Sequence, residues 1–423
     1  MDRPRTVLYV EHAGELGGAC VSLREMLSAL DPARVRPIVA MIRPSDELKR
    51  FYADRGIEAF SWEGIAALEH TTARWASVWR PASWPLGIRT IAGWRRGERR
   101  TLGLVERVGP DLVHLSSAVL APSARALHRS GVPFVWHVRE MPVRGHLGAR
   151  SAALRAAMRD WPDALVFLSG GARDAWGAPP HSAVVPEFVD LARFRPDLDR
   201  GRARARLGLD GRAPVVLYVG GMSAIKGVLT LLGALTRVRR RLPELVCLMP
   251  GGATAPGTLV RFASALVPAL TLTGRIREAI ASGRLDSVCR RLPFTSDMPE
   301  MMAASDVLAF PSTVDHFARP VVEAGAMARP VVASRLPMIE EQAGREGGAI
   351  LVRPGDAREL ADALLEVLAR PDRARALGER GRETATRRFD LRRNTDEVMA
   401  LYDRVLESRS ISRSGSAGFT RCA

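Results

Sequence analysis

Two carboxylates stand out in this 423-residue sequence because of what surrounds them. Asp315 lies shortly after the apolar run DVLAF, which is bounded by Pro311 and predicts a buried parallel strand. Glu323 lies shortly after Pro320, whose fixed φ suits the start of a helix. The run PVVAS then predicts the next strand of a βαβ unit. Because ligands bind at the carboxyl ends of parallel strands, we expect Asp315 and Glu323, the latter in the first helical turn, to face the same crevice.

The carboxylate of Glu323 has two interpretations. It complements the positive end of the helix dipole, an effect of a few tenths to ~1 kcal/mol. Alternatively, it accepts hydrogen bonds from the hydroxyl groups of a ligand, to which the backbone N–H groups of residues 317–319 also donate. Periodicity alone favours the first interpretation.

Lys226 belongs to a second candidate site. The run PVVLYV predicts a strand, and Gly220, Gly221, Lys226 and Gly227 follow it before an apolar helix. The G-K-S/T of a Walker A loop is absent, but a glycine turn at a helix N-terminus binds anions through its free N–H groups. A lysine is unfavourable there without an anion. We therefore predict that Lys226 binds a phosphate, a contact worth ~1.5–3 kcal/mol; the alternative is a solvated side chain.

The elements that position these residues alternate between short apolar runs and helical stretches. Strands are predicted at residues 6–12, 36–42, 111–116, 133–138, 163–169, 214–219, 244–250, 306–310 and 330–334. This pattern predicts an α/β fold with doubly wound parallel sheets covered by helices on both faces. We expect two similar Rossmann-like domains, at residues 1–196 and 213–388, joined by an arginine-rich linker. A helix at 389–408 and a polar tail at 409–423, which we expect to be disordered, complete the chain.

Gly17, Gly18 and His137 lie at the ends of predicted strands or in the loops after them in the first domain. The two glycines open a predicted helix at 19–30, where the backbone can approach a ligand. The G-x-G-x-x-G fingerprint is absent, and a plain turn is the simpler explanation. His137 ends the run PFVWH, and a lone histidine at such a position is more often structural than catalytic.

The composition bounds the class of protein. Hydrophobic residues make up 47% of the chain and charged residues 26%, as in a soluble globular protein. We find neither a signal peptide nor a run of the ~18 apolar residues that a spanning helix needs. Four cysteines without C-x-x-C spacing fit a reducing cytoplasm. The net charge of +16, nearly all from arginine, suits nucleic acid, anionic lipid or phosphate-bearing substrates without choosing among them.

Residues 73–100 differ in composition from the rest of the chain. They hold four of the eight tryptophans and seven arginines against one acid, Glu98. Tryptophan with arginine is typical of a segment that lies on an anionic membrane surface. A surface insertion whose tryptophans pack on the sheet is an equal alternative. Nucleic-acid binding by stacking is less favoured because aromatic residues are few elsewhere.

The motif around the two carboxylates resembles a known family signature. Phe317, Pro320 and Glu323 match the E-G-F-G-x-P-x-x-E motif of retaining glycosyltransferases of family 4, which is built on E-x7-E. Asp315 replaces the first glutamate, and His316 and Ala318 replace the glycines.

Other stretches resemble the same family in the same order. Lys226 and Gly227 match its V-G-R-x-x-x-x-K-G motif, with Gly221 at the arginine position, so that one of two usual phosphate-binding cations is missing. Gly17–Gly18 matches the N-terminal glycine loop, and VVPEFVDLARFRP matches N-G-V-D-x-x-x-F-x-P. The stretch SRLPMIEE has Pro337 and Met338 where the family has glycines, which we expect to reshape the donor loop. The resemblance extends from about residue 6 to 407.

The resemblance implies the GT-B architecture, in which two Rossmann-like domains face a central cleft and the last helix returns to the first domain. It implies that Lys226 binds the donor diphosphate, Glu323 the nucleotide ribose and Asp315 the hydroxyls of the transferred sugar. The implied catalytic residues are His137, Asp315 and Glu323. The implied donor-binding residues are Gly17, Gly18, Gly221, Lys226, Gly227, Asp315, His316, Phe317, Ala318 and Glu323. The implied acceptor-binding residues are Gly18, His137, Arg139 and Glu140.

The function that follows is a retaining, metal-independent glycosyltransferase. The D-x-D pair that would hold a metal is absent, so we expect Lys226, arginines and a helix N-terminus to stabilise the departing diphosphate. We expect no cofactor, a UDP- or GDP-linked sugar as donor, and a glycan or lipid-linked acceptor. The setting would be cell-envelope or exopolysaccharide assembly, in the cytoplasm, at the inner face of the plasma membrane if residues 73–100 bind lipid.

Two alternatives remain at this point. One is another enzyme of the same fold, a sugar-nucleotide epimerase or a phosphorylase. The other is a non-catalytic basic protein that binds membrane or nucleic acid through a degenerate transferase fold. The departures at Gly221, Asp315 and Ala318 support the second alternative, whereas Lys226 and Glu323 argue against it. We expect no nucleic-acid partner.

Overall fold

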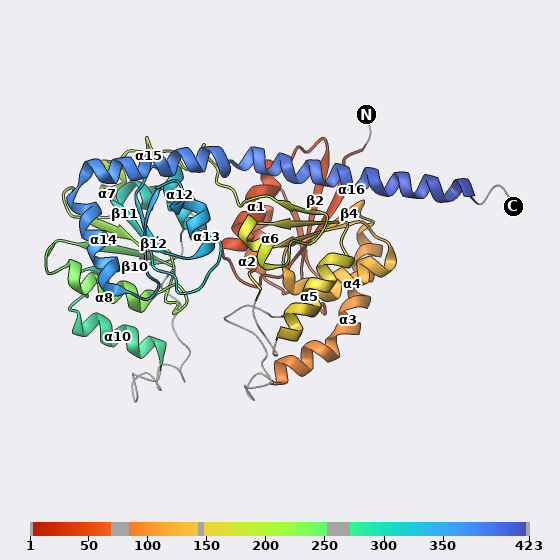
Figure 1. The fold of residues 1–423 in the computed structure, drawn as a ribbon, viewed down its shortest axis with the longest axis horizontal. Coiled ribbons are helices and arrows are strands. Elements are labelled where there is room, and N and C mark those ends of the chain that lie inside the picture. Colours follow the sequence, from red (N-terminus) through yellow and green to blue (C-terminus); the bar gives the residue numbers. More distant parts are fainter. Residues whose placement is uncertain are drawn as a thin grey trace. The chain divides into compact units, whose positions relative to one another are not determined.

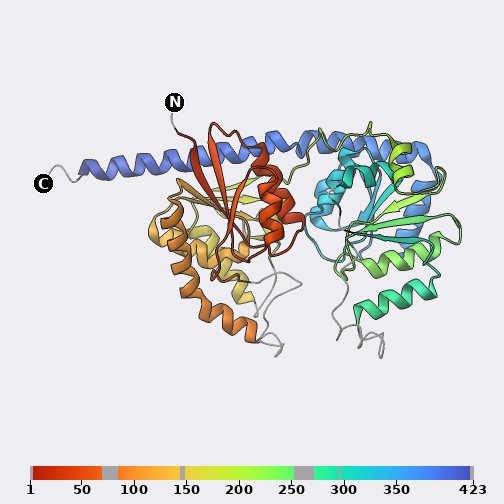
Figure 2. The ribbon, with the colours of Figure 1, turned by 180° about the vertical axis from the view of Figure 1, so that it is seen from behind.

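The computed structural model describes residues 3–68, 84–142, 148–251, 271–293, 295 and 297–419, without the side chains of residues 85–87, 89–91 and 412–419. The chain divides into two compact units. Unit 1 comprises Met1–Phe188 and Leu391–Ala423, and unit 2 comprises Val189–Asp390. Each unit is an α/β structure with helices on both faces of a parallel sheet (Figures 1 and 2).

The sheet of unit 1 has seven parallel strands in the order β3-β2-β1-β4-β5-β6-β7. Their bounds are β1 Arg5–Glu11, β2 Val35–Met41, β3 Glu58–Ser61, β4 Leu112–Leu115, β5 Phe134–Val138, β6 Ala164–Phe167 and β7 Ser182–Val184. The strand order reverses between β1 and β4, which pair directly. The loops that follow β1 and β4 therefore separate at the carboxyl edge and open a crevice there.

The helices of unit 1 bury apolar stripes against this sheet. They are α1 Gly18–Ala29, α2 Asp46–Ala53, α3 Trp84–Val108, α4 Ala121–Ser130, α5 Ala149–Asp160, α6 Gly170–Ala175 and α16 Leu391–Phe419, with a 3₁₀ turn at Ala118–Leu120. Val398, Leu401 and Tyr402 of α16 lie in one core cluster with Tyr9 of β1 and Leu23 of α1. The last helix is thus part of the core of unit 1.

The sheet of unit 2 has six parallel strands in the order β10-β9-β8-β11-β12-β13. Their bounds are β8 Val215–Leu217, β9 Val246–Pro250, β10 Cys289–Leu292, β11 Val307–Phe310, β12 Val331–Ser334 and β13 Ala349–Val352. The order reverses between β8 and β11, so the crevice of this unit opens at their carboxyl ends.

Helices cover both faces of the second sheet. They are α7 Arg200–Arg206, α8 Val228–Val238, α10 Leu272–Ser282, α11 Met298–Ala304, α12 Arg319–Ala326, α13 Pro337–Ile339, α14 Ala357–Ala369 and α15 Pro371–Arg388, with a π-helical turn at Glu340–Gly344. In Figure 1, α8 and α10 lie on one side of the strands, and α12 and α15 lie on the other. One core cluster joins Val216, Leu231 and Leu364, and a second joins Leu217, Val322 and Ala385.

The predicted fold class is confirmed, since each predicted strand is found in one of two parallel sheets. The sequence did not indicate β3, β7, β10 or β13, all four of which lie at sheet edges. Their side chains are largely half-buried or exposed, which removes the continuous apolar run that marks a central strand.

Two boundaries differ from those expected. Unit 2 begins at Val189 rather than after residue 196, because the backbone N–H of Val189 donates to the carbonyl of Phe389 at 2.7 Å where the chain leaves the unit. Helix α16 continues to Phe419, where we expected a disordered tail from residue 409. The sequence has neither glycine nor proline between residues 391 and 414, so the packed part of the helix can propagate.

The region of residues 73–100 is helical from Trp84 onward, and Pro85 lies in the first turn of α3, where a proline costs no hydrogen bond. Residues 73–83, with Trp75 and Trp79, lie outside the described residues. Trp94 is half-buried and its indole N–H donates to Glu98 at 2.8 Å. Among the described residues, we find no helix that combines the length and hydrophobicity needed to cross a membrane.

Candidate active site

Unit 2 brings the predicted cation and the acidic motif together at its switch point. Lys226 lies in the loop after β8, and residues 311–318 form the loop after β11. The two loops are hydrogen-bonded, since the Ser312 hydroxyl and the Thr313 N–H each donate to the carbonyl of Ile225 at 2.9 Å. The strand order thus explains how residues far apart in sequence form one site.

Lys226 contacts His316 directly through a hydrogen bond between Nζ and Nε2. The other ring nitrogen, Nδ1, lies 2.8 Å from the carbonyl of Val314, so it carries the proton and Nε2 accepts from the lysine. Burial lowers the pKa of Lys226 to about 8. Burial and then the charge of Lys226 lower the pKa of His316 to about 4. The site therefore holds one ammonium group, presented on a neutral imidazole, near pH 7.

Two glycines fix the path of the Lys226 loop. Gly227 precedes α8 with a φ of +75°, and a Cβ there would lie 1.7 Å from the carbonyl oxygen of Pro311. Only glycine allows the two loops to approach so closely. Gly221 has a φ of +56°, a conformation that strains an arginine. The glycine that stands in place of the family's arginine adopts this backbone without strain.

Asp315 is anchored at one oxygen. Its Oδ1 accepts from the backbone N–H of Met338 at 3.0 Å, which ties the acidic motif to the start of α13. Its Oδ2 is buried and has no hydrogen-bond partner among the described residues. Burial raises the pKa of this carboxyl, the bond from Met338 opposes that effect, and Glu341 adds to it. One oxygen is thus available to a ligand.

Glu323 does not lie in the first turn of α12, contrary to the sequence prediction. The helix begins at Arg319, one residue before Pro320, which moves Glu323 to the second turn and one turn from Arg319. The guanidinium Nε of Arg319 donates to Glu323 Oε1 at 2.7 Å, and the two side chains are 11% and 7% exposed. The carboxylate is buried and paired, so the helix dipole does not account for it.

Phe317 and Ala318 are held by the protein. The Phe317 ring packs edge-on against Phe389 at 6.1 Å between centroids. The Ala318 N–H, which we expected to contact the donor, donates to Gln342 Oε1 at 3.0 Å instead. Gln342 comes from the π-helical turn, a distortion often found at functional sites. Its Nε2 is buried without a partner among the described residues.

In unit 1, Gly17 and Gly18 open α1 as predicted. Gly17 is the N-cap, in extended conformation, and Gly18 is the first helical residue. A Cβ on either would meet no atom within 4 Å, so packing does not require glycine here. The space in front of the helix N-terminus is open to a ligand.

His137 belongs to a row of buried polar groups. Its Nδ1 lies 3.3 Å from His114 Nε2, His114 Nδ1 lies 2.7 Å from the Tyr402 hydroxyl, and that hydroxyl lies 3.1 Å from the hydroxyl of Tyr9. Burial lowers the pKa of His114 to about 3 and that of His137 well below its usual value, with Arg139 adding to both shifts. His137 is therefore neutral, and its Nε2 is buried with no partner in the described part of the chain.

Arg139 and Glu140 are already engaged within unit 1. Arg139 pairs with Glu187 at 2.9 Å and its guanidinium lies 3.4 Å from the Ser22 hydroxyl on α1. Glu140 accepts from the Ser117 hydroxyl and from the N–H groups of Ala118 and Arg139 at 3.0 and 3.1 Å. These bonds give Glu140 a structural role and place Arg139 beside the glycine loop.

Several residues of the site escaped the sequence analysis. Arg319 was recoverable, because it precedes Glu323 by four positions, the spacing of a helical ion pair. Gln342, His114 and Tyr402 had no such signal, since each meets its partner through the tertiary fold. Glu11, the last residue of β1, and His12 form a further pair at 3.3 Å. Burial would raise the pKa of Glu11, but His12 lowers it overall.

The comparisons with known proteins agree with this geometry. Residues 199–384, which comprise most of unit 2 and the whole Lys226–Glu323 site, match the family model of glycosyl transferases group 1. A GDP-mannose-dependent alpha-(1-6)-phosphatidylinositol monomannoside mannosyltransferase of Mycobacterium tuberculosis is 30% identical over 286 residues, 64% of this chain and 68% of that protein. The chain belongs to the family of group 1 glycosyltransferases.

Other relatives and solved structures extend the match. A D-inositol 3-phosphate glycosyltransferase of Saccharomonospora viridis is 34% identical over 57% of this chain and 52% of its own length. Matches to the first curated relatives span about half to two thirds of those proteins. The crystal structure of Anabaena Alr3699/HepE in complex with UDP shares the fold, with a TM-score of 0.74, 18% identity, and coverage of 94% of this chain and 99% of that one.

Proposed function

We propose that the protein is a retaining glycosyltransferase that takes a sugar from a UDP- or GDP-linked donor. The observation that carries this proposal is the half-buried Lys226–His316 pair at the switch point of unit 2, beside the acidic motif. Within the described part of the chain no carboxylate bonds to the Lys226 ammonium group, so an external anion would be stabilised there. A diphosphate supplies that anion.

The donor would be held by groups from both loops and from α12. Lys226 would bind the diphosphate, with His316 orienting its ammonium group. Glu323, positioned by Arg319, would accept hydrogen bonds from the ribose hydroxyls. The open oxygen of Asp315 would accept from a hydroxyl of the sugar. The names of the similar proteins support either uracil or guanine as the base of the donor nucleotide. One relative is named as GDP-mannose-dependent, and a protein of the same fold was crystallised with UDP.

We propose that transfer proceeds with retention and without a divalent metal. Lys226 would neutralise the charge that develops on the departing diphosphate, as a preformed electrostatic group does in a water-poor site. The departing phosphate would then accept the proton of the acceptor hydroxyl, which attacks the anomeric carbon from the same face. Asp315 and Glu323 would act on hydroxyl groups and not as an acid and base pair.

Unit 1 would bind the acceptor. The open N-terminus of α1 at Gly17–Gly18 and the nearby Arg139 suit an acceptor that carries a negative charge. His137 would present its unpaired Nε2 to the acceptor or the reacting sugar. The relatives' names include acceptors built on inositol phosphate and phosphatidylinositol. A lipid-linked or phosphorylated acceptor in cell-envelope or exopolysaccharide glycan assembly is therefore our proposal.

We also propose that α3 approaches an anionic membrane surface to reach such an acceptor. Trp84 and Ile88, one helical turn apart on α3, are 52% and 66% exposed. Large apolar side chains on a basic helix insert at the boundary between lipid head groups and acyl chains.

The stereochemistry of the product tests the central reaction. We would incubate the protein with α-linked UDP- and GDP-sugars and with inositol phosphate or phosphatidylinositol acceptors, and follow the anomeric configuration by NMR. The proposal predicts an α-linked product at the same rate with EDTA as with magnesium. A β-linked product, a strict metal requirement, or epimerised donor without transfer would each contradict it.

A further inference from the structure

A pocket of about 460 Å³ in unit 2 lies at the opposite end of the strands from the Lys226 site. It is lined by residues that precede β8, β11 and β12, together with the end of α14 and the start of α15. Because parallel strands place all their amino ends at one edge, this pocket is separate from the donor loops, which follow the same strands.

Arginine dominates the polar lining of this pocket. Arg200, Arg212, Arg329 and Arg375 line it, with Asp306 as the one carboxylate in the lining. Asp306 is already fully bonded. Its Oδ1 accepts from Arg200 at 2.5 Å, and its Oδ2 accepts from Arg204 at 2.9 Å and from the Val215 N–H at 2.8 Å. Arg375 pairs with Asp372 at 3.5 Å, so the positive charge that remains in the lining comes mainly from Arg212 and Arg329.

Arg329 is the group whose bonding is incomplete. Its Nε is buried and makes no hydrogen bond to any described residue. Burial lowers the pKa of Arg329, and the nearby charges of Arg200 and Arg204 add to this, although Asp306 opposes it. A buried donor on a cation surrounded by other cations is unfavourable unless an anion occupies the site.

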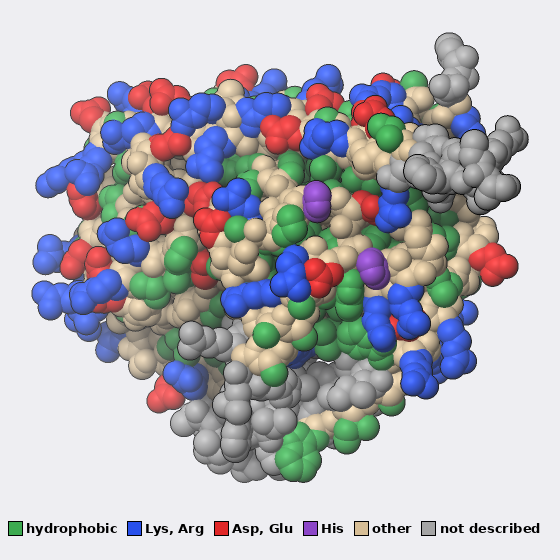
Figure 3. All heavy atoms as spheres, turned by 45° about the vertical axis from the view of Figure 1, so that its right-hand side comes forward, with side chains coloured by type: hydrophobic (Ala, Val, Ile, Leu, Met, Phe, Trp, Pro, Cys, Tyr) green, Lys and Arg blue, Asp and Glu red, His purple; other side chains and the backbone are tan. Residues whose placement is uncertain are grey.

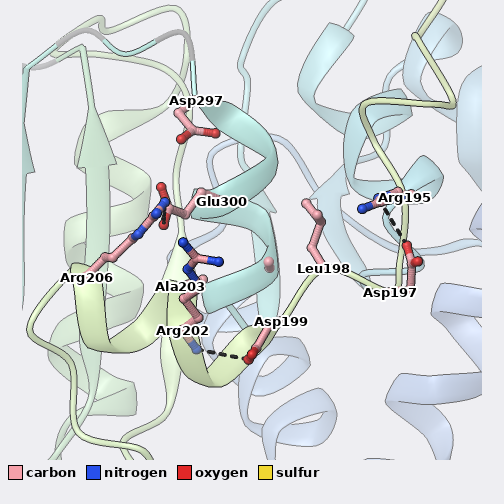
Figure 4. Close-up of a pocket in the computed structure, with 10 residues that line it drawn as sticks. Arg195, Asp197, Leu198, Asp199, Arg202, Ala203, Arg206, Asp297 and Glu300 are labelled. Carbon is pink, nitrogen blue, oxygen red and sulfur yellow. Dashed lines mark hydrogen bonds and ion pairs between the residues drawn. The ribbon is translucent and has the colours of Figure 1, made fainter.

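A neighbouring pocket of unit 2 provides a contrast. It measures about 440 Å³ and is lined by Arg195, Arg202 and Arg206 but also by four carboxylates, at residues 197, 199, 297 and 300 (Figure 4). Arg195 pairs with Asp197 at 3.4 Å, and Arg206 pairs with Glu300 at 3.0 Å. Arginine-lined hollows in this arginine-rich chain are therefore not all cationic.

We propose that the arginine pocket at the amino ends of β8, β11 and β12 binds a small phosphate-bearing molecule. Its phosphate would lie against Arg329 and Arg212, because the planar guanidinium group matches phosphate oxygens in pairs. Pro214, Leu368 and Pro371 form an apolar side of the pocket that would contact the remainder of the molecule. The site is independent of the donor site proposed above.

Variants of the full chain distinguish phosphate binding in this pocket from phosphate binding at the donor site. Inorganic pyrophosphate is titrated by calorimetry into Lys226→Ala protein, which lacks the donor-site cation. We expect binding to persist, and to weaken at least about tenfold when Arg329→Gln is added, as the loss of a charge-assisted bond predicts. Arg212→Gln, an exposed change, should weaken binding similarly. The matched control Arg202→Gln, on the same helix as Arg200 but lining the neighbouring pocket, where carboxylates outnumber arginines, should change affinity by less than about twofold.

Two outcomes would overturn the proposal. One is the loss of all pyrophosphate binding in Lys226→Ala, and the other is equal weakening by Arg202→Gln and Arg329→Gln, which would indicate net charge alone. Thermal unfolding adds a second readout. Arg329→Leu should raise the midpoint in phosphate-free buffer and abolish the rise that phosphate gives the parent protein. The affinity of the donor site for UDP or GDP should be unchanged in Arg329→Gln. If the arginine pocket proves not to bind phosphate, the proposed transferase activity is therefore unaffected.

Discussion

At the scale of single residues, the proposed donor site depends on how Lys226 and His316 are paired. The family motif has a glycine where His316 stands and an arginine where Gly221 stands. The φ of +56° at Gly221 disfavours an arginine, and the imidazole of His316 instead holds the lysine in place. In the proposed donor site, one cation oriented by His316 would therefore stand where the family motif has two.

The pH dependence of nucleotide binding tests this arrangement. The pKa of Lys226 is lowered to about 8 in the free protein, so its ammonium form is lost as the pH rises through 8. We predict that affinity for UDP or GDP is constant between pH 7 and 7.5 and falls roughly tenfold per pH unit above 8. Calorimetry from pH 7 to 9.5 measures this. A flat profile in the parent protein would contradict the prediction, as would the same slope in Lys226→Ala.

The same shift affects folding stability with a defined sign. The folded-state pKa of Lys226 is lower than its unfolded value, so the unfolded chain binds more protons between pH 8 and 10.5. The contribution of this residue to stability therefore increases as the pH rises through that window. It is most unfavourable below pH 8, where binding of a diphosphate removes the penalty.

The sequence predicts which residues belong to this site better than it predicts their partners. Lys226 was recognisable because lysine is rare in the chain and follows a glycine turn. The helix start was misplaced by one residue, because Pro320 is accepted at the first or the second helical position. That single step changes Glu323 from a dipole-facing residue to a buried partner of Arg319. The hydrogen bond from Ala318 to Gln342 depends on a π-helical turn, which the local sequence does not predict.

At the scale of elements, α16 reaches the candidate catalytic histidine through hydrogen bonds. Tyr402 of α16 contacts His114 of β4, and His114 contacts His137 of β5. Each histidine of the row has one proton to share, so the tautomer of His137 is coupled to that of His114 and to the Tyr402 hydroxyl. The last helix thus contacts a candidate site residue through hydrogen bonds, although the two lie more than 250 positions apart in sequence.

Tyr402→Phe tests the row of hydrogen bonds. It leaves a buried nitrogen of His114 without a partner, and we predict a loss of ~1–3 kcal/mol in the free energy of unfolding. Transfer activity should fall with an altered pH profile, because the tautomers of His114 and His137 are no longer coupled to the Tyr402 hydroxyl. Tyr9→Phe is the matched control, since Tyr402 keeps its bond to His114. Denaturant titration and pH–rate profiles measure both effects, and equal behaviour of the two variants would refute the role of the row.

The sequence predicts a strand or helix well where its side chains are uniformly buried, and poorly where buried and exposed side chains are mixed. The central strands β1, β4, β8 and β11 are buried almost throughout and mostly apolar, and their order then places the loops of the candidate sites. The side chains of the edge strands β3 and β10 are exposed or half-buried, and neither strand forms a continuous apolar run. Helix α16 was recognisable only over its packed, amphipathic part.

At the scale of the whole molecule, the net charge of +16 is spread rather than concentrated. On the face that Figure 3 shows, basic side chains outnumber acidic ones but are interspersed with them. Many arginines pair with nearby carboxylates, as Arg36 does with Glu58 and Arg125 with Glu98. The charge alone therefore favours no single partner, and specific sites must provide selectivity.

Membrane association is tested with sedimentation of vesicles that contain anionic lipid. We predict binding at low salt that weakens above 0.15 M, where screening acts within about 8 Å. The double variant Trp84→Ala, Ile88→Ala should lose most of this binding, because it removes the exposed apolar side chains of α3. Leu102→Ala, a less exposed position on the same helix, is the control. Absence of binding at low salt would contradict the proposal.

The most direct test of the account is calorimetric titration of UDP and of GDP into the full chain, with magnesium and with EDTA. We predict that at least one nucleotide binds with the same affinity in both buffers. Lys226→Ala should weaken it roughly 10- to 150-fold, the loss of one charge-assisted contact. Lys49→Ala, which changes the one other lysine in the sequence, should have no effect. The account would be contradicted if neither nucleotide binds, or if both lysine variants bind as tightly as the parent protein.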